Sequence, residues 1–342
     1  MTKKTKSVGV VILTWNDWRN TVECLNSLFK NNYEKFDIIL VDNNSNDYNY
    51  QKLVNWLGKK KIKINFIKEK NNTNKRKFKR NKNFYLFKIN DAANFRFAEN
   101  LGITRGYNKG IEFALKKSYD FIVRVDCDFI VPSNLIKGLT NTLIENEKSV
   151  AVSPKVYYYL NKKTKLIWWV KLKYNKNYFR FQQTGFNQNR RTLDTGQFKG
   201  LSYSDSVCGC CVMYRSKSLI DASKIEPSRK KIFDEDFFYG PDDMELSHRL
   251  KKIGSILVNR DYFAYHKVAQ SIHVSGIKSN IYFATLGWLL LTKKICNKKD
   301  QILCRIYFIF RGCIHLLRLI YKKDKNPHIG FLLGLKDYFL KY

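Results

Sequence analysis

This sequence of 342 residues contains no run of about twenty uninterrupted apolar residues, so we expect no membrane-spanning helix. Residues 1–7 form a short basic lead into an apolar strand and lack the layout of a signal peptide. The pattern G-x-G-x-x-G does not follow the first predicted strand, which argues against a dinucleotide-dependent dehydrogenase. The pattern G-x-x-x-x-G-K-[ST] is also missing, which excludes the P-loop enzymes.

Acidic residues are scarce beside basic ones, with 29 Asp and Glu against 63 Lys and Arg and a formal net charge of +34. Such an excess attracts polyanions, which include nucleic acid, anionic lipid and phosphorylated substrates. Residues 68–83 are dense in Lys, Arg and Asn, and we interpret 68–95 as a solvated basic insertion. The chain is nevertheless 44% hydrophobic, which is enough to form a core.

The eight cysteines show no zinc-site spacing. Cys208, Cys210 and Cys211 cluster, but no second Cys or His pair accompanies them, and Cys24 and Cys127 lie in apolar segments. We predict that all eight are reduced and structural, in a reducing, cytoplasmic compartment.

Apolar runs alternate with helical patterns along the first half of the chain. Buried strands are predicted at 8–13, 38–41, 62–67 and 121–125, and helices at 51–57 and 107–117. Further strands are predicted at 150–156, at 207–214 and from 255 toward His266, and a helix at 242–250. The alternation predicts an α/β fold with a mostly parallel, Rossmann-like sheet flanked by helices.

The segment from 278 onward has a different pattern and predicts a helical extension. Residues 302–320 are apolar, but Arg311, His315 and Arg318 recur on one helical face, which indicates an amphipathic basic helix. Packing against the main domain and association with an anionic membrane surface are both open for this helix.

Asp126 and Asp128 follow the predicted strand 121–125. Side chains two apart on a strand share a face, so both carboxylates can point to one spot beyond the carboxyl end of the strand, where open α/β sheets bind ligands. Two carboxylates there suit a divalent cation shared with a substrate phosphate. The alternative is an ordinary Asp-containing turn.

Polar residues also follow the neighbouring strands. Asp42 ends the second strand, where a carboxylate can accept a hydrogen bond from a nucleobase or a ribose hydroxyl, and Thr14 and Asn16 lie in the loop after the first strand. Asn100 and Arg105 belong to a glycine-containing segment before a helix, where Arg105 could meet a phosphate.

A second acidic centre precedes the helix at 242–250. Asp242 and Glu245 match an N-cap residue and its partner three positions later, which would make both structural. Asp243 is then left to take a proton from an attacking hydroxyl, and Tyr239 lies in the adjoining aromatic loop that could face a sugar. His266, just after a predicted strand, is a plausible further ligand for a metal such as Mn²⁺, although a lone histidine is more often structural.

Taken in order, these segments resemble the family-2 inverting glycosyltransferases of the GT-A fold, and among them the rhamnosyltransferase-like and galactofuranosyltransferase-like groups. The resemblance covers roughly residues 8–272. The matching positions are Val10 to Asn16, Val41 to Ser45, Glu99 to Gly102, Asp126 to Asp128, Gly209, Asp242 to Leu246, Arg249 and Leu250, His266 and Ser271.

The resemblance implies a role for each matched residue. Thr14 and Asp42 would hold the nucleotide, Asp126 and Asp128 would bind Mg²⁺ or Mn²⁺ on the diphosphate, and Asp243 would be the base. His266 could complete the metal site. Asp242 and Tyr239 are predicted on the acceptor side because they belong to the acidic, aromatic segment around Asp243. The implied enzyme is a metal-dependent, inverting hexosyl- or deoxyhexosyltransferase.

The resemblance implies the class of donor, while the basic, amphipathic C-terminal segment and the net positive charge suggest a lipid-linked acceptor and a separate C-terminal extension. The donor would be a nucleoside-diphosphate sugar and the acceptor a glycan or lipid-linked glycan, with no specific nucleic acid. A GT-A domain over 1–277 would carry a helical extension over 278–342, placed at the inner face of the cell membrane if the extension binds lipid. Three departures from the family pattern stand out, namely the insertion at 68–95, Pro241 with Asp242 where Glu is more usual, and Trp15 where Tyr is commoner.

Other classes remain open on the sequence alone. The net charge and the run Lys75–Arg80 suit a polyanion-binding protein, which would bind with strong salt dependence but gives no reason for the acidic centres. A retaining transferase or a nucleotidyltransferase could share the sheet, but a nucleotidyltransferase usually has a Gly-rich, basic first loop, whereas this loop reads Thr14–Asp17. A catalytically inactive homologue is a further alternative.

Overall fold

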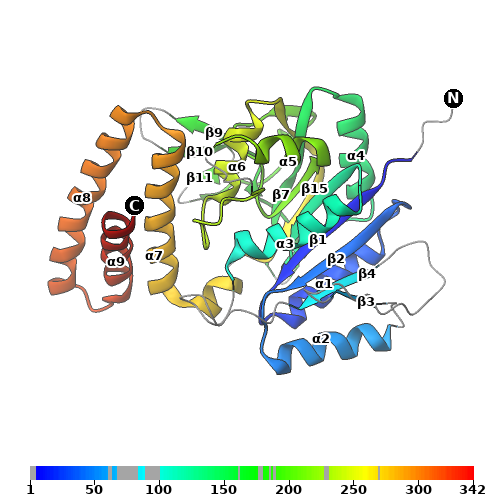
Figure 1. The fold of residues 1–342 in the computed structure, drawn as a ribbon, viewed down its shortest axis with the longest axis horizontal. Helices are drawn as coiled ribbons and strands as arrows, with labels where there is room; N and C mark the ends of the chain where they lie inside the picture. The colour runs from blue at the N-terminus through cyan, green and yellow to red at the C-terminus, as the bar shows by residue number, and fades with distance from the viewer. Residues whose placement is uncertain are drawn as a thin grey trace.

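The computed structural model describes residues 5–60, 64–67, 84–88, 101–160, 162–175, 180–184, 186–187, 190–226, 231–268 and 270–342. A sheet of eleven strands forms its centre, in the order β13-β15-β7-β14-β5-β1-β2-β4-β3, with β6 paired to β15 and β8 to β7. The chain begins at one end of the sheet plane, and the last helices lie at the opposite end of the molecule (Figure 1).

One half of the sheet is parallel. It consists of β1 (Val8–Thr14), β2 (Phe36–Asp42), β3 (Ile64–Ile67), β4 (Phe84–Lys88) and β5 (Phe121–Asp126). The predicted strands of this half are confirmed. Strand β4, however, lies inside the interval predicted as a solvated insertion, so these five residues belong to the sheet instead.

The other half of the sheet is mixed. Its strands are β6 (Phe129–Ile130), β7 (Ser149–Tyr159), β8 (Lys163–Trp169), β13 (Leu201–Tyr203), β14 (Cys211–Arg215) and β15 (Ser255–His266). Strand β14 runs antiparallel to both β5 and β7, whereas β15 is parallel to β7. The strand predicted at 207–214 begins only at Cys211, because residues 207–210 form a turn before β14. Small antiparallel ribbons join β9 (Lys171–Asn175) to β10 (Arg180–Thr184) and β11 (Phe186–Asn187) to β12 (Arg190–Arg191).

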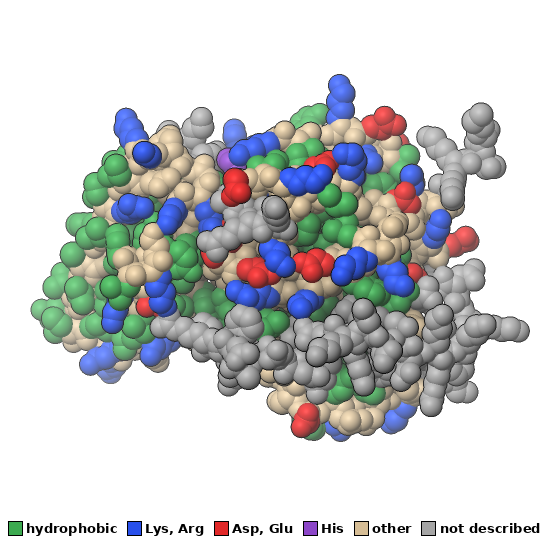
Figure 2. All heavy atoms as spheres, viewed as in Figure 1, with side chains coloured by type: hydrophobic (Ala, Val, Ile, Leu, Met, Phe, Trp, Pro, Cys, Tyr) green, Lys and Arg blue, Asp and Glu red, His purple; other side chains and the backbone are tan. Residues whose placement is uncertain are grey.

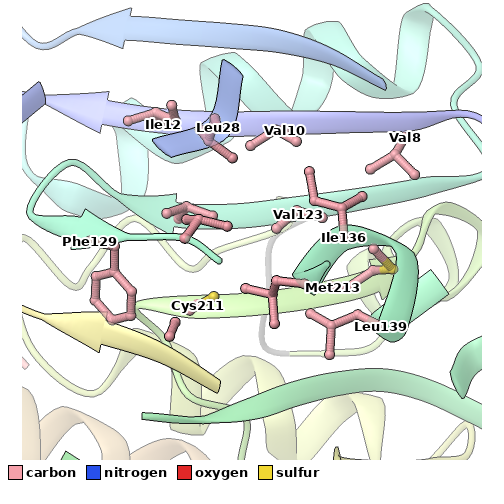
Figure 3. Close-up of a cluster of buried hydrophobic side chains, with 14 of the residues drawn as sticks. Val8, Val10, Ile12, Leu28, Val123, Phe129, Ile136, Leu139, Cys211 and Met213 are labelled. Carbon is pink, nitrogen blue, oxygen red and sulfur yellow. The ribbon is translucent and has the colours of Figure 1, made fainter. Parts of the chain in front are cut away.

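Helices cover both faces of the sheet. One face packs α1 (Trp18–Phe29), α2 (Asp47–Lys59) and α4 (Leu135–Glu145) against alternate side chains of the strands, as with Leu28, Ile136 and Leu139 in Figure 3. The other face packs α3 (Ile103–Lys116), α5 (Ser216–Ser223) and α6 (Asp242–Leu250). Strands buried on both faces explain the continuous apolar runs of the sequence, and the predicted α/β layering is confirmed.

The C-terminal extension is a unit of three helices, namely α7 (Gln270–Ile295), α8 (Lys298–Tyr321) and α9 (Asn326–Lys341). Gly276 has a φ of 74° and interrupts α7 near its start. Leu289, Leu290, Cys304 and Tyr338 form a core that also includes Phe237 of the loop before α6. The extension therefore packs on the domain, on the side of the second acidic centre. No helix within the described parts of the chain is long and apolar enough to cross a membrane.

The faces of α8 are arranged differently from the sequence-based expectation. His315 is buried against α9, where it stacks on Phe331 at 4.1 Å, and the Arg311 guanidinium lies over the same ring at 5.3 Å. Most of the predicted basic face thus points inward, because guanidinium and imidazole groups stack on an aromatic ring of α9. The opposite side, which we call the outer face of α8, is exposed and apolar; it comprises Ile302, Ile306, Ile309, Phe310, Leu316, Leu317 and Ile320.

Candidate active site

The predicted donor-side residues lie at the carboxyl ends of neighbouring parallel strands. Thr14 of β1 is in register with Asp42 of β2, and Leu13 is in register with Asp126 of β5. Thr14 and Asp42 are almost fully buried. The sheet therefore brings Thr14, Asp42 and Asp126 to one edge, where open α/β sheets hold ligands.

The loops after β1 and β2 are tied to each other. The Thr14 and Thr21 hydroxyl groups are 2.7 Å apart, and Asp42 Oδ1 accepts a hydrogen bond from the Ser45 N–H at 2.8 Å. Asn16 has a φ of 52° and accepts a bond from the Asn46 N–H, while its own N–H donates to Ser45 Oγ. A short polar side chain tolerates this left-handed backbone, so Asn16 helps to shape the loop.

Asn43, which the sequence analysis did not single out, links this edge to α3. Its amide nitrogen donates to the Gly102 carbonyl and its oxygen accepts from the Leu101 N–H, both at 3.1 Å. Gly102 has a φ of 82°, and a Cβ there would lie 2.7 Å from Phe238. The predicted residue Asn100 lies outside the described residues, and the Arg105 guanidinium lies 3.5 Å from Glu235.

Two residues that the sequence analysis did not single out as functional, Tyr107 and Arg124, lie next to the Asp126 carboxylate. The Tyr107 hydroxyl of α3 donates to Asp126 Oδ1 at 2.6 Å, and Arg124 Nε lies 4.0 Å from the same oxygen. Burial raises the pKa of Asp126, Arg124 lowers it, and the neighbouring carboxylate of Asp128 raises it. The available signal was Arg124 itself, since a charge inside an otherwise apolar strand needs a buried partner.

Arg124 connects the two acidic centres. Its Nη1 donates to Asp242 Oδ2 at 2.7 Å, both side chains are about 3% exposed, and its guanidinium stacks 4.2 Å from the Tyr107 ring. Its Nε is buried without a hydrogen-bond partner among the described residues. Three carboxylates contribute negative charge to this region, those of Asp126, Asp242 and Asp243. Within the described structure, Arg124 is the one buried cation that contacts Asp242.

The capping box predicted for α6 is wrong. Asp242 is the first helical residue, after Pro241, and makes no side-chain cap; its carboxylate binds Arg124 instead. Glu245 pairs with Arg249 through two hydrogen bonds of 2.8 and 2.6 Å, inside the core. Each carboxylate thus binds a buried arginine, Arg124 in the case of Asp242 and Arg249 in the case of Glu245. These charge-assisted bonds are stronger than the bonds that backbone N–H groups at the helix start would offer.

Asp243 lies in the first turn of α6, half-buried, and faces the turn before β14. Its Oδ2 accepts a hydrogen bond from the Gly209 N–H at 3.1 Å, and its Oδ1 accepts from the Met244 N–H at 2.9 Å. A Cβ on Gly209 would lie 2.6 Å from Asp243 Oδ2, so only glycine lets the carboxylate approach. Burial, together with the charge of Asp242, raises the pKa of Asp243 to about 7.

The same turn joins Asp243 to the strand that carries the other carboxylates. The Asp126 N–H donates to the Cys210 carbonyl at 2.9 Å, one residue after Gly209. Tyr239 also lies here: desolvation and then nearby ionisable groups, Asp126 and Asp128 among them, raise its pKa to about 12. Residues from three separate parts of the sequence therefore gather at one end of the sheet.

Asp128 and His266 are the two predicted metal ligands that contact each other. His266 Nε2 lies 3.3 Å from Asp128 Oδ2, with the imidazole stacked between Phe129 at 4.6 Å and the edge of Trp168 at 4.4 Å. Adjacent ligands of an octahedral ion with bonds of about 2.1 Å lie about 3 Å apart, so this pair fits a shared cation. Within the described structure no three His, Cys, Asp or Glu side chains are grouped closely enough to hold an ion by themselves, so further ligands would have to come from a substrate.

All eight cysteines are free, as predicted. Cys210 and Cys211 flank this edge. A hydrogen bond with Cys208 and then burial raise the pKa of Cys210, and burial raises the pKa of Cys211. Raised pKa values keep these residues as thiols rather than reactive thiolates, which agrees with a structural role.

Comparisons with known proteins were consistent with this architecture. The family model described as glycosyl transferase family 2 matches residues 9–78 and 88–221, more than half of the chain. Two crystal structures of S. aureus TarS are similar in fold: one with a TM-score of 0.53 and 14% identity, the other, of TarS 1–349, with 0.51 and 12%. Each similarity covers 98% of this chain, and it covers 49% of the first TarS chain and 92% of the second.

This chain therefore spans about half the length of the first TarS structure. A search among curated proteins finds no matching sequence. At these identities the TarS structures support the fold of the chain and nothing finer.

Proposed function

Because the chain belongs to glycosyl transferase family 2, we propose that it transfers a sugar from a nucleoside-diphosphate sugar to a hydroxyl group of an acceptor, with inversion at the anomeric carbon. The observation that carries this proposal is the convergence at residues 209–210. The Gly209 N–H binds Asp243, and the Cys210 carbonyl binds the Asp126 N–H. One carboxylate with a pKa near neutrality thus lies beside a donor-side acidic pair.

The donor side of the reaction is assigned to the edge formed by β1, β2 and β5. We assign the nucleoside to the crevice floored by Thr14 and Asp42, with Asn16 and Asn43 holding the loops that border it. The diphosphate would then lie over Asp126 and Asp128. Arg105, paired with Glu235, would reach a phosphate only by exchanging that partner.

A divalent cation, Mn²⁺ or Mg²⁺, fits the oxygen and nitrogen atoms that Asp128 and His266 present to one point. Asp126 does not group closely enough with this pair to complete a three-residue site, so the remaining ligands would come from the diphosphate. A bound cation would supply positive charge beside the diphosphate, which is the leaving group of the transfer.

Asp243 is assigned as the general base. With a pKa of about 7, roughly half of the carboxylate is ionised at neutral pH, and that ionised form can take the proton of the acceptor hydroxyl. Gly209 fixes the carboxylate. The acceptor oxygen would form its bond to the anomeric carbon as the bond to the diphosphate breaks on the opposite side, and its proton would pass to Asp243, so the configuration inverts without a covalent enzyme intermediate. Asp242, predicted on the acceptor side, is assigned a positioning role because its carboxylate is buried on Arg124.

The acceptor is proposed to be a glycan or lipid-linked glycan that enters past Tyr239, whose side chain is 41% exposed. Rhamnosyl or galactofuranosyl transfer stays a prediction, as does a hexosyl or deoxyhexosyl donor. A lipid-linked acceptor would place the enzyme at the cytoplasmic face of a membrane. The family match favours sugar transfer over the nucleotidyltransferase alternative and over a protein that only binds polyanions.

The direct test uses purified enzyme with a panel of nucleoside-diphosphate sugars, Mn²⁺ or Mg²⁺, and a thermal-shift readout to find the donor. The Asp243→Asn variant should then lose transfer by a factor of about 10²–10⁴ while its donor affinity stays unchanged, because only the base is removed. Asp128→Ala should instead lose the cation-dependent part of donor binding.

Asp261→Asn, an exposed change in β15, is the matched control and should behave as the parent enzyme. Normal transfer rates in Asp243→Asn would refute the assignment of the base, and donor binding that ignores both cations would refute the metal site.

A further inference from the structure

The outer face of α8 is an apolar surface for which the fold itself provides no partner within the described residues. Ile306 is 57% exposed, Phe310 64% and Ile320 72%. Figure 2 shows hydrophobic side chains gathered at the edge of the molecule where Figure 1 places α8, with Lys and Arg side chains above and below them. Contiguous exposed apolar patches of this kind mark interaction sites on monomeric proteins.

The inner side of α8 already satisfies the packing needs of the helix. Cys304, Gly312 and His315 are buried, and His315 stacks on Phe331 of α9. A helix that is packed on one side normally presents polar residues to water on the other. Here Arg311 and His315 lie on the inner side and four isoleucines lie outside, so these positions of α8 are explained only if the outer face has a partner.

The charges around this face indicate what that partner is. Residues 301–323 contain no Asp or Glu, and residues 278–342 contain 13 Lys and Arg against three Asp. Lys298 and Lys299 precede the outer face, and Lys322, Lys323 and Lys325 follow it; all five are exposed. An apolar strip with cations at both ends complements a surface that is apolar inside and anionic at its boundary.

A second copy of the chain is a poor partner for the same reason. In a two-fold arrangement the α8 helices would pack either parallel or antiparallel. Both arrangements place the lysines at one end of α8 beside lysines of the other copy, and the two carboxylates at these ends, of Asp300 and Asp324, are fewer than the five lysines. Like charges brought together in this way oppose association.

We propose that the outer face of α8 docks this enzyme onto an anionic lipid leaflet, with the helix parallel to the membrane plane. The isoleucine, leucine and phenylalanine side chains enter the boundary between headgroups and acyl chains, and the flanking lysines contact lipid phosphates. The surface that binds is therefore the apolar face of the helix and not the Arg311–His315 face, which is occupied by α9.

The position of α7 relates this docking to the reaction. Phe283 of α7 stacks on Phe238 at 4.6 Å, and Lys294 binds Asp234 and Asp236, so α7 packs on the loop that leads to Asp243. The helical unit that touches lipid is thus the one that borders the acceptor side. Resting on the proposed function, this arrangement suits an acceptor that is itself anchored in the bilayer.

Vesicle flotation of the full chain tests the docking. Vesicles of phosphatidylcholine with phosphatidylglycerol should bind the parent protein. Pure phosphatidylcholine vesicles should bind it at least about tenfold less, because their zwitterionic surface has no net negative charge to attract the lysines. The variant Ile306→Ser/Phe310→Ser should bind the anionic vesicles at least about tenfold less than the parent, since each side chain contributes its own burial in the interface. Tyr48→Ser/Tyr203→Ser removes two exposed aromatic side chains elsewhere and should bind as the parent does.

Three outcomes would overturn the proposal: equal binding by the Ile306/Phe310 variant, equal binding to both kinds of vesicle, or a parent protein that is dimeric and becomes monomeric in this variant without a change in vesicle binding. Both variants change exposed positions, so both should fold, and thermal unfolding is the measurement that checks this. Transfer to a water-soluble acceptor is measured alongside, so that loss of lipid binding and loss of catalysis are separate results.

Discussion

At the residue scale, Asp243 combines a fixed position with a raised pKa, and we expect it to set the pH dependence of sugar transfer. If Asp243 is the base, kcat/KM should rise about tenfold per pH unit below pH 7 and level off above it, because the carboxylate must be ionised. The pKa of Asp243 is above its ordinary 3.8, so the folded chain binds this proton more tightly than the unfolded chain does. Its contribution to stability is therefore present at acid pH and is lost as the pH rises through about 7.

Urea unfolding between pH 4 and 8 measures this loss, and Asp243→Asn is the control because it cannot titrate. A pH–rate profile that is flat from pH 5 to 8 in the parent enzyme would be incompatible with Asp243 as the base.

Arg124 is the second residue with a sharp expectation. Arg124→Met leaves Asp242 buried without a cation, so we expect a loss of roughly 3–5 kcal/mol in the free energy of unfolding. Arg124 also lowers the pKa of Asp243, so its removal should move the acid limb of the pH–rate profile to higher pH. Arg124→Lys keeps the charge and should keep the limb near its original position.

The double variant Arg124→Met/Asp242→Asn separates the two effects. It removes both charges and should be more stable than Arg124→Met alone, because no unpaired buried carboxylate remains. A pH–rate profile that does not move in Arg124→Met would mean that Arg124 supports the fold without tuning the site.

At the scale of elements, α7 contacts the loop before α6 through one basic residue, Lys294, in addition to the ring contact of Phe283. Lys294 Nζ lies 2.6 Å from Asp234 and 2.7 Å from Asp236, with its side chain 9% exposed, and its pKa is raised by these two carboxylates against the opposing effect of burial. Lys294→Met should lower the free energy of unfolding by roughly 3 kcal/mol in chemical denaturation, because it leaves two carboxylates without their cation.

Lys293→Met is a matched control one position away. Lys293 is exposed and contacts the chain end at Tyr342, so this change should stay within about 0.5 kcal/mol of the parent. Equal losses in the two variants would show that the junction between α7 and the loop does not depend on the ion pair.

At the scale of the whole molecule, the reacting edge and the C-terminal helices lie at the same end. The carboxyl ends of β1, β2 and β5 carry the candidate site, and α7 packs on the loop beside it, as Figure 1 shows. The protein therefore has two large-scale surface features, a net charge of +34 and the exposed apolar outer face of α8. The second feature distinguishes one side of the molecule from the others.

Local sequence patterns predicted most of the elements. The strands of the parallel half and the helix at 242–250 were predicted because burial on both faces and the 3.6-residue period leave clear marks in composition. Strand β4 was missed because it lies among Lys- and Asn-rich residues, where composition favours a solvated segment. The turn before β14 was missed because the residues from Val207 to Cys210 are as apolar as a strand.

The sequence alone determined the fold class, the family and the identity of most candidate residues, because spacing along one strand or helix fixes which side chains share a face. Only the tertiary structure decided which partners those residues have. Asp242 reads as a helix cap until Arg124, 118 positions away, is seen to bind it, and α8 reads as a basic helix until α9 covers its arginine. Contacts between distant segments depend on how elements pack, and no local period in the chain records them.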